Sequence, residues 1–328
     1  MEEELIKMIF EIEEKNEFEE LALKVFNFQA KNNIIYQQYI NALNVSISSV
    51  RTINQIPFLP ISFFKNHKIT TGNFIPERVF TSSGTTGMTT SKHYVKKLSV
   101  YEESMIRGFQ LFFGKPSEYV LLALLPSYLE RTGSSLVYMT DKLIQLSGDA
   151  RSGFYLHNYK SLYQNLQILK KQNKKTILLG VTYALLDMVE QFDIDFPDLI
   201  VMETGGMKGN RKEMVKEELH NKLKSGFGVE KIYSEYGMTE LLSQAYSYGR
   251  GVFQTPPWMK ILIRDVNDPL NILSVGHSGG INIIDLANLH SCSFIATQDL
   301  GKTINEDQFE ILGRFDNSDV RGCNLLIQ

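Results

Sequence analysis

The sequence is poor in cysteine, with only Cys292 and Cys323 among its 328 residues. Two isolated cysteines make neither a disulfide framework nor a zinc cluster, and they fit a reducing compartment, so we expect a cytoplasmic protein. An excess of basic side chains is also lacking, because the formal net charge is −3, and nucleic acid is therefore not an expected partner. The longest apolar run, residues 119–125, is too short to span a membrane, and the acidic start at residues 1–4 is unlike a signal peptide.

From about residue 78 onward, short apolar runs alternate with longer segments of helical periodicity. Strands are expected at residues 119–125, 176–179, 199–202 and 230–233, and helices at residues 100–113, 134–146, 159–171, 183–191 and 211–223. This alternation predicts an α/β fold with a largely parallel sheet that helices cover on both faces.

Further along the chain the helical pattern stops, and β-like runs follow at residues 260–263, 280–284, 293–296 and 309–312. We therefore expect three regions. Residues 1–77 form a helical region packed on the core, residues 78–250 an α/β nucleotide-binding region, and residues 251–328 a β-rich subdomain.

Residues 81–87 contain five hydroxyl side chains and two glycines. Glycine lets successive backbone N–H groups turn toward one anion, and the hydroxyls add further donors, so the loop is a candidate phosphate site. The Walker loop does not fit, because Gly87 is followed by Met88 rather than by Lys and Ser or Thr. A polar surface turn is the alternative. The candidate phosphate-binding residues are Ser82, Ser83, Gly84, Thr85, Thr86 and Gly87.

Three more motifs follow: Tyr-Gly-Met-Thr-Glu at residues 236–240, Asp-Leu-Gly at 299–301 and Gly-Arg-Phe-Asp at 313–316. At these residues and at the Ser/Thr/Gly loop, the chain resembles the adenylate-forming superfamily. That superfamily includes acyl-CoA and aryl-CoA ligases, firefly luciferase and the adenylation domains of peptide synthetases. The four elements stand in the superfamily's order, which implies its large N-terminal-type domain and the use of ATP with Mg²⁺.

The resemblance implies roles for single residues. The loop would hold the β- and γ-phosphates, although the superfamily's lysine beyond the last glycine is Thr90 here. Glu240 would be the Mg²⁺ ligand, since this ion prefers oxygen ligands such as carboxylates. Thr239 would contact a phosphate group. The ribose would meet Asp299, and Arg314 would contact ribose and phosphate. Adenine would lie between Tyr236, with Gly237 beside it, and the turn at Gly205 and Gly206. The alternatives are a core tyrosine and an ordinary strand–helix turn.

The sequence ends twelve residues beyond Asp316, where the superfamily normally continues into a mobile C-terminal domain, so we expect a protein without that domain. In this respect it resembles the LuxE-type acyl-protein synthetases of the bacterial luminescence fatty-acid reductase complex. The resemblance implies ATP-dependent activation of a carboxylic acid, most simply a fatty acid, and transfer of the acyl group to a cysteine near the C-terminus. Cys323 is in the matching region, with an acyl reductase as a candidate partner. A buried structural thiol is the alternative for Cys323, and Cys292 is expected to be structural.

Two rival functions stay open at this point. The chain could be a carboxylate ligase that passes its adenylate to CoA or an acyl-carrier protein, or a non-catalytic nucleotide-binding module. The retained Thr239, Glu240 and Asp299 argue against the second. By resemblance, residues 127–128, 182–183 and 205–207 line the acyl pocket, but their side chains do not choose between fatty and aromatic acids.

Overall fold

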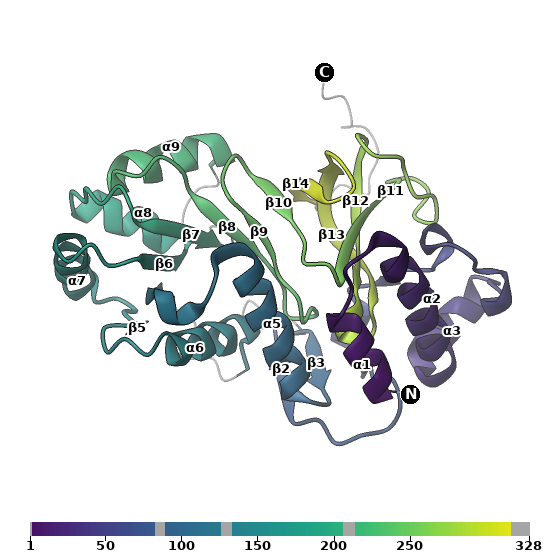
Figure 1. The fold of residues 1–328 in the computed structure, drawn as a ribbon. Helices are drawn as coiled ribbons and strands as arrows, with labels where there is room; N and C mark the ends of the chain where they lie inside the picture. Colours follow the sequence, from purple (N-terminus) through teal and green to yellow (C-terminus); the bar gives the residue numbers. More distant parts are fainter. Residues whose placement is uncertain (1, 83–88, 126–132, 206–213, 316–328) are drawn as a thin grey trace.

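The computed structural model describes residues 2–82, 89–125, 133–205 and 214–315. One 12-stranded sheet runs through this part of the molecule, in the order β11-β12-β13-β14-β10-β9-β8-β7-β6-β4-β5, with β1 (Leu59–Pro60) added beside β13 (Figure 1). Its parallel part consists of β4 (Val120–Leu124), β5 (Gly153–Phe154), β6 (Thr176–Val181), β7 (Ile200–Thr204) and β8 (Tyr233–Tyr236). This confirms the α/β fold class.

Helices cover both faces of the parallel part. On one face lie α5 (Leu98–Phe113) and α6 (Ser135–Ser147), and on the other lie α7 (Tyr159–Lys171), α8 (Thr182–Gln191) and α9 (Lys216–Phe227) (Figure 1). Successive strand residues point to opposite faces. Accordingly, Leu121 and Leu179 join the hydrophobic cluster of α5 and α6, whereas Leu122 and Leu178 join that of α7, α8 and α9. Burial on both faces explains why these strands read as continuous apolar runs.

Several expected boundaries are wrong. The strand expected at residues 293–296 is β13, which extends over Phe294–Thr303. The strand expected at residues 230–233 is β8, Tyr233–Tyr236, which pairs with β7 from Met202↔Tyr233 onward. The helix expected at residues 211–223 is α9, which ends only at Phe227, before Gly228 with a φ of +67°. Glycine tolerates this left-handed conformation and so ends the helix.

The expected β-rich part is antiparallel. It contains β9 (Ala245–Ser247), β10 (Val252–Gln254), β11 (Met259–Arg264), β12 (Ser278–Asp285), β13 (Phe294–Thr303) and β14 (Gln308–Arg314). It continues the parallel part without a break, because β8 pairs with β9. The division at residue 250 stays a prediction, and the strands on its two sides, β9 and β10, are hydrogen-bonded neighbours.

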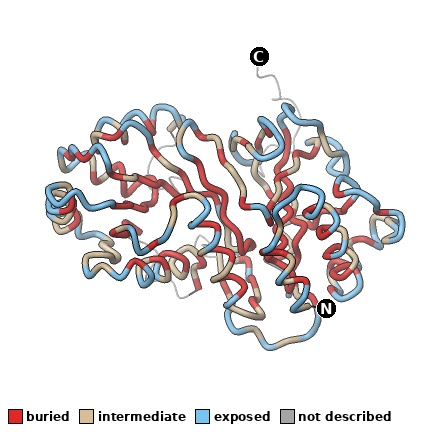
Figure 2. The backbone as a smooth tube through the Cα atoms, viewed as in Figure 1, coloured by how far each residue is buried: buried red, intermediate tan, exposed pale blue. Residues whose placement is uncertain are grey.

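The N-terminal helices pack against the antiparallel part. They are α1 (Glu2–Phe10), α2 (Lys15–Asn32) and α3 (Ile34–Ala42), followed by the short α4 (Phe63–Asn66). The fully buried Gln29 of α2 donates to the backbone carbonyls of Asn288 and Leu289, at 2.9 and 3.0 Å. Phe26 meets Phe294 of β13 edge to face, with ring centroids 6.0 Å apart. Figure 2 shows the buried backbone concentrated along the central strands and the inner sides of these helices.

Candidate active site

The Ser/Thr/Gly loop starts from a hairpin of β2 (Arg78–Thr81) and β3 (Lys92–Val95). Its base is closed by two hydrogen bonds: the Ser82 amide donates to the Ser91 carbonyl at 3.1 Å, and the Ser91 amide donates to the Ser82 hydroxyl at 2.9 Å. The structure thus describes Ser82 but not the rest of the loop. The predicted residues that lie outside the described part of the chain are Ser83, Gly84, Thr85, Thr86, Gly87, Gly206 and Cys323.

The carboxyl group of Glu240 lies against the base of this hairpin. Glu240 is only 5% exposed, and the Ser91 side chain is hydrogen-bonded to its carboxyl group. Burial raises the pKa of Glu240 above its usual value, while the Ser91 hydrogen bond and the charges of Arg314 and Lys65 act in the opposite direction. Two motifs that are about 150 residues apart in the sequence therefore meet in space.

The backbone of the Thr239–Glu240 turn is held by side chains that the sequence analysis did not single out. His93 on β3 makes a 2.8 Å hydrogen bond from Nδ1 to the Thr239 carbonyl. Asn288 donates to the Glu240 carbonyl at 2.8 Å. Shortly after Glu240, the backbone amides of Leu242 and Ser243 donate to the carboxylate of the buried Asp285, at 2.8 and 3.0 Å. These contacts fix where the carboxyl group of Glu240 points.

The contact at Thr239 requires a proton on Nδ1 of His93, because the carbonyl can only accept. Burial lowers the pKa of His93 to about 4. The unfolded chain takes up a proton near pH 6.5 and the folded one does not, so stability falls as the pH drops from 6.5 toward 4. The buried Asp285, whose pKa is raised to about 6, contributes the opposite slope in the same range.

We expect His93→Asn to remove this acid sensitivity while keeping an N–H donor for the Thr239 carbonyl. The free energy of unfolding, measured in urea at pH 7.0 and 4.5, should fall more in the parent than in the variant, by roughly 2–3 kcal/mol. The contribution of Asp285 is common to both proteins and cancels in this difference. Equal acid sensitivity of the two proteins would contradict a buried, neutral His93.

Asp299 and Arg314 lie directly opposite each other on β13 and β14. The Arg314 Nε is 3.3 Å from Asp299 Oδ1, and the Tyr236 hydroxyl donates to Asp299 Oδ2 at 2.7 Å. The Tyr236 ring is buried and meets Phe253 and Phe309 edge to face. The Arg314 side chain is 70% exposed, so its guanidinium is accessible to a ligand. The structure thus brings three predicted residues together at one place.

The turn after β7 lies beside this group. Gly205 has a φ of +66°, and its carbonyl accepts from the Thr182 hydroxyl at 2.6 Å. Just before it, the Thr204 hydroxyl donates to the carboxylate of Glu235 at 2.5 Å. A Cβ atom at Gly237 would lie 2.5 Å from the other oxygen of Glu235, so a larger residue at this position would displace that carboxylate. The Gly-rich turn and the Tyr-Gly motif are thereby tied to each other.

A buried ionic group supports the same turn from the opposite face. Glu203 accepts from the Ser234 hydroxyl at 2.6 Å, and Lys216 Nζ and His220 Nε2 both lie 3.6 Å from the same carboxylate oxygen. Burial acts to raise the pKa of Glu203, but His220, Lys216 and Ser234 bring it below its usual value. This carboxylate is therefore ionised at neutral pH and fixes β7 to β8 and α9 just before Gly205.

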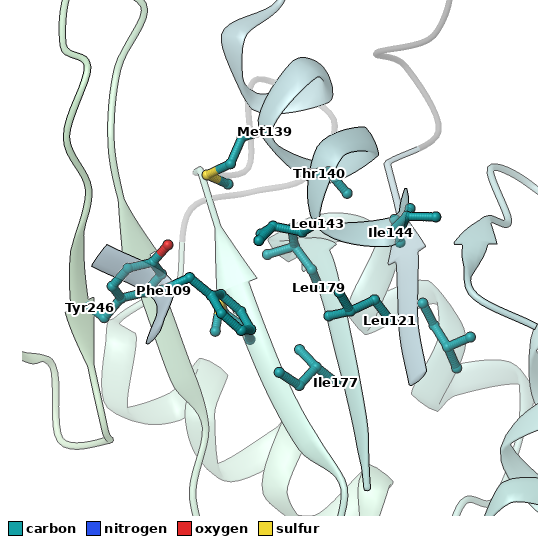
Figure 3. A pocket seen from close by; sticks show the side chains of 12 residues that line it. Phe109, Leu121, Met139, Thr140, Leu143, Ile144, Ile177, Leu179 and Tyr246 are labelled. Carbon is teal, nitrogen blue, oxygen red and sulfur yellow. The ribbon is translucent and has the colours of Figure 1, made fainter. Parts of the chain in front are cut away.

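An apolar cavity lies on the α5–α6 face of the sheet (Figure 3). Its walls include Leu121 of β4, Leu179 of β6 and Met202 of β7, with Met139 and Leu143 of α6 opposite them. About 20 Å³ is free inside, which is enough for about one water molecule. The described residues expected beside the acyl group are Thr182, Tyr183 and Gly205, and none of them belongs to this lining. The others, residues 127–128 and 206–207, lie outside the described part of the chain.

The donor set of the site fits a magnesium–triphosphate group. In the described residues, His, Cys, Asp and Glu side chains form no cluster of three or more that would hold a metal ion by themselves. One buried carboxylate, Glu240, does lie at the base of the loop, and Mg²⁺ usually takes only one or two carboxylates from the protein and the rest from phosphate and water.

Among the described residues, no helix has the length and apolarity that a membrane span requires.

The solved structures with the same fold include acid-activating ligases. An open form of 2-hydroxyisobutyryl-CoA ligase, in complex with 2-HIB-AMP and CoA, has a TM-score of 0.66 at 12% identity, covering 92% of this chain and 71% of the ligase. ATP-bound MatB from Rhodopseudomonas palustris has a TM-score of 0.55 at 15% identity, covering 72% of this chain and 47% of MatB. This chain therefore matches about half the length of MatB. At these identities the likeness shows the fold.

A comparison with curated protein sequences returns no significant match. The sequence profile of the acyl-protein synthetases of the LuxE type, by contrast, matches residues 7–328. The fold of the adenylate-forming ligases, the juxtaposed motifs and this match agree with one another. The chain belongs to the LuxE acyl-protein synthetase family and, with it, to the AMP-forming acid ligases.

Proposed function

We propose that this protein uses ATP to convert a carboxylic acid, with a fatty acid as the favoured class, into an acyl-adenylate, and then passes the acyl group to its own Cys323. The observation that carries the proposal is the convergence of Glu240, Ser91 and Thr239 at the loop base with the Tyr236–Asp299–Arg314 group. Three groups that ATP requires thus lie close together. They are an acceptor for the ribose diol, Asp299, a cation for the phosphates, Arg314, and a buried carboxylate, Glu240.

In the first step, an oxygen of the substrate carboxylate attacks the α-phosphorus of ATP. A new P–O bond forms, the bond between the α-phosphorus and the bridging oxygen breaks, and pyrophosphate leaves. Arg314 is a permanently charged donor that suits the phosphate oxygens, and the two carboxylate oxygens of Asp299 suit the two ribose hydroxyls. Before ATP binds, the Asp299 oxygens contact Tyr236 and Arg314. On binding, these two side chains would move away from Asp299 or share its oxygens with the ribose hydroxyls.

Glu240 would hold the magnesium ion that accompanies ATP. When bound, such an ion neutralises negative charge on the triphosphate. The protein's own contribution is to keep the Glu240 carboxyl group fixed and largely dry. Ser91 contacts that carboxyl group, and Asn288 and His93 hold the backbone on either side of it.

In the second step, a thiolate sulfur attacks the acyl carbonyl carbon, the bond to AMP breaks, and AMP leaves. The sequence offers two cysteines. Cys292 is fully buried in β-sheet surroundings, and burial raises the pKa of its thiol to about 12, so almost no thiolate is available there. Self-acylation on cysteine therefore requires Cys323.

The cavity on the α5–α6 face supports a substrate with an apolar chain. Its lining includes residues of β4, β6 and β7, the last of which ends beside Gly205, and it is almost wholly hydrocarbon. An acyl chain is larger than the free volume, so the chain would have to displace lining side chains. Met139, a flexible thioether without branching at Cβ, is the side chain best suited to move.

The test is acid-dependent release of pyrophosphate, measured with MgATP and a panel of aliphatic and aromatic carboxylic acids. We expect release with aliphatic acids and retention of the acyl group on the protein. If pyrophosphate is released but the acyl group is transferred only to added CoA or acyl-carrier protein, the acceptor is the thiol of that carrier and not Cys323. If no acid gives release while ATP still binds, the non-catalytic nucleotide-binding function is the correct one.

A further inference from the structure

One polar group faces the apolar cavity without a partner. Tyr246 of β9 is 1% exposed, and its hydroxyl has no hydrogen-bond partner in the described structure. Its ring is held edge to face by Phe113, with centroids 5.3 Å apart, and Tyr246 is part of the cavity lining. Figure 3 shows the oxygen on the side of the ring that faces Met139. Buried hydroxyl groups are normally hydrogen-bonded, so this one needs an explanation.

The position of Tyr246 connects the cavity with the reaction site. Tyr246 lies opposite Glu235, which is adjacent in sequence to Tyr236. Residues directly opposite in a sheet share a face, so Tyr246 stands on the same face as the Thr204–Glu235 pair at the end of β7. Met202, also in the lining, is two residues before that end. The hydroxyl is thus near the carboxyl ends of the strands, where ligands bind in open α/β sheets.

We propose that the Tyr246 hydroxyl donates a hydrogen bond to an oxygen on the acyl chain of the substrate, so that the protein selects hydroxy or oxo acids over the unsubstituted fatty acid. This inference rests on the proposed function. It explains both the apolar lining, which accepts the chain, and the single unpaired donor, which the chain would satisfy. A site that pairs a buried polar group with the correct substrate rejects the analogue that leaves it unpaired.

The activity test uses decanoic acid and its hydroxy and oxo derivatives, substituted near the carboxyl group, in mid-chain or at the terminal carbon. For the parent protein, kcat/KM for pyrophosphate release should be at least about tenfold higher with one of the substituted acids. Tyr246→Phe should lose that preference, so that the ratio of kcat/KM with the substituted acid to kcat/KM with decanoic acid falls to about one. Equal rates for all acids, or a preference that survives in Tyr246→Phe, would overturn the inference and leave the proposed function intact. If none of the acids gave pyrophosphate release, both the inference and the proposed function would be wrong.

A stability measurement tests the unpaired hydroxyl independently of activity. The matched control is Tyr101, which is also 1% exposed on the same side of the sheet but donates to the Ser135 carbonyl at 3.1 Å. Tyr101→Phe loses this bond, and its Tm should fall by roughly 1–3 °C. Tyr246→Phe loses no bond in the ligand-free protein, so its Tm should stay the same or rise. A decrease in Tyr246→Phe as large as in Tyr101→Phe would show that the hydroxyl is already paired.

Discussion

Replacing Glu240 by glutamine is expected to lower acid-dependent pyrophosphate release by about a hundredfold or more, because the one buried carboxylate at the loop base would lose its charge. Glutamine keeps the shape of the side chain and can still hydrogen-bond Ser91. Since burial disfavours the charged form of Glu240, the Tm of Glu240→Gln should be unchanged or higher. The measurement combines initial rates at saturating acid with thermal unfolding of the same preparation.

Glu102→Gln provides the control for loss of a negative charge elsewhere. Glu102 on α5 forms an ion pair with Lys142 at 2.9 Å, and neither side chain contacts the site residues described above. The rate of pyrophosphate release by Glu102→Gln should stay within about twofold of that of the parent. If Glu240→Gln turned over as fast as Glu102→Gln, the assignment of Glu240 to the ATP site would be wrong.

Replacing Cys323 by serine is expected to abolish the hydroxylamine-labile acyl label on the protein while leaving adenylate formation in place. Adenylation as proposed uses Glu240, Thr239, Asp299 and Arg314, none of which needs the thiol. A serine hydroxyl is a far weaker nucleophile than a thiolate at neutral pH when no base is adjacent. Radioactive acid, followed by precipitation with and without hydroxylamine, measures the label, and pyrophosphate release measures the first step.

The second cysteine supplies the matched control. Cys292→Ala removes a fully buried thiol whose sulfur lies 3.5 Å from the Phe294 carbonyl. The variant should label as the parent does, although it will be less stable because a small cavity replaces the sulfur. Labelling of Cys323→Ser at the parental level would rule out Cys323 as the acceptor, and a folded Cys292→Ala without label would reverse the roles of the two cysteines.

Much of the fold could be predicted because its signals are local. The strand β4 is buried at every position, and such continuous apolar runs bounded by helices are typical of a parallel sheet. The boundary of β8 could not be predicted this way, because Ser234 and Glu235 are polar. They are buried in the strand only through their partners Glu203 and Thr204 on β7.

Sequence motifs indicate the candidate site residues, but they do not indicate the contacts that form where distant chain segments meet. Motifs single out Asp299 and Arg314 as candidates, and the structure has them on neighbouring strands of one hairpin. The contact of His93 with Thr239 joins positions 146 residues apart, and nothing around His93 in the sequence indicates it. The local signal is the alternation of Ser91, just before β3, with His93 and Val95 of β3 as buried positions, and this alternation predicts burial rather than a partner.

The packing of α2 on η4 (Leu286–Asn288) and β13 has a consequence for synthesis of the chain. Gln29 and its partner Asn288 are 259 positions apart, and β1 pairs with β13 over a similar span. At ribosomal rates this separation corresponds to roughly ten seconds to a minute. During that time the helices made first have emerged without the surface that later covers them, and their apolar side chains, Phe26 among them, stay open to chaperones and to other nascent chains. The helix α2 is thus synthesised long before the segment that completes its native contacts.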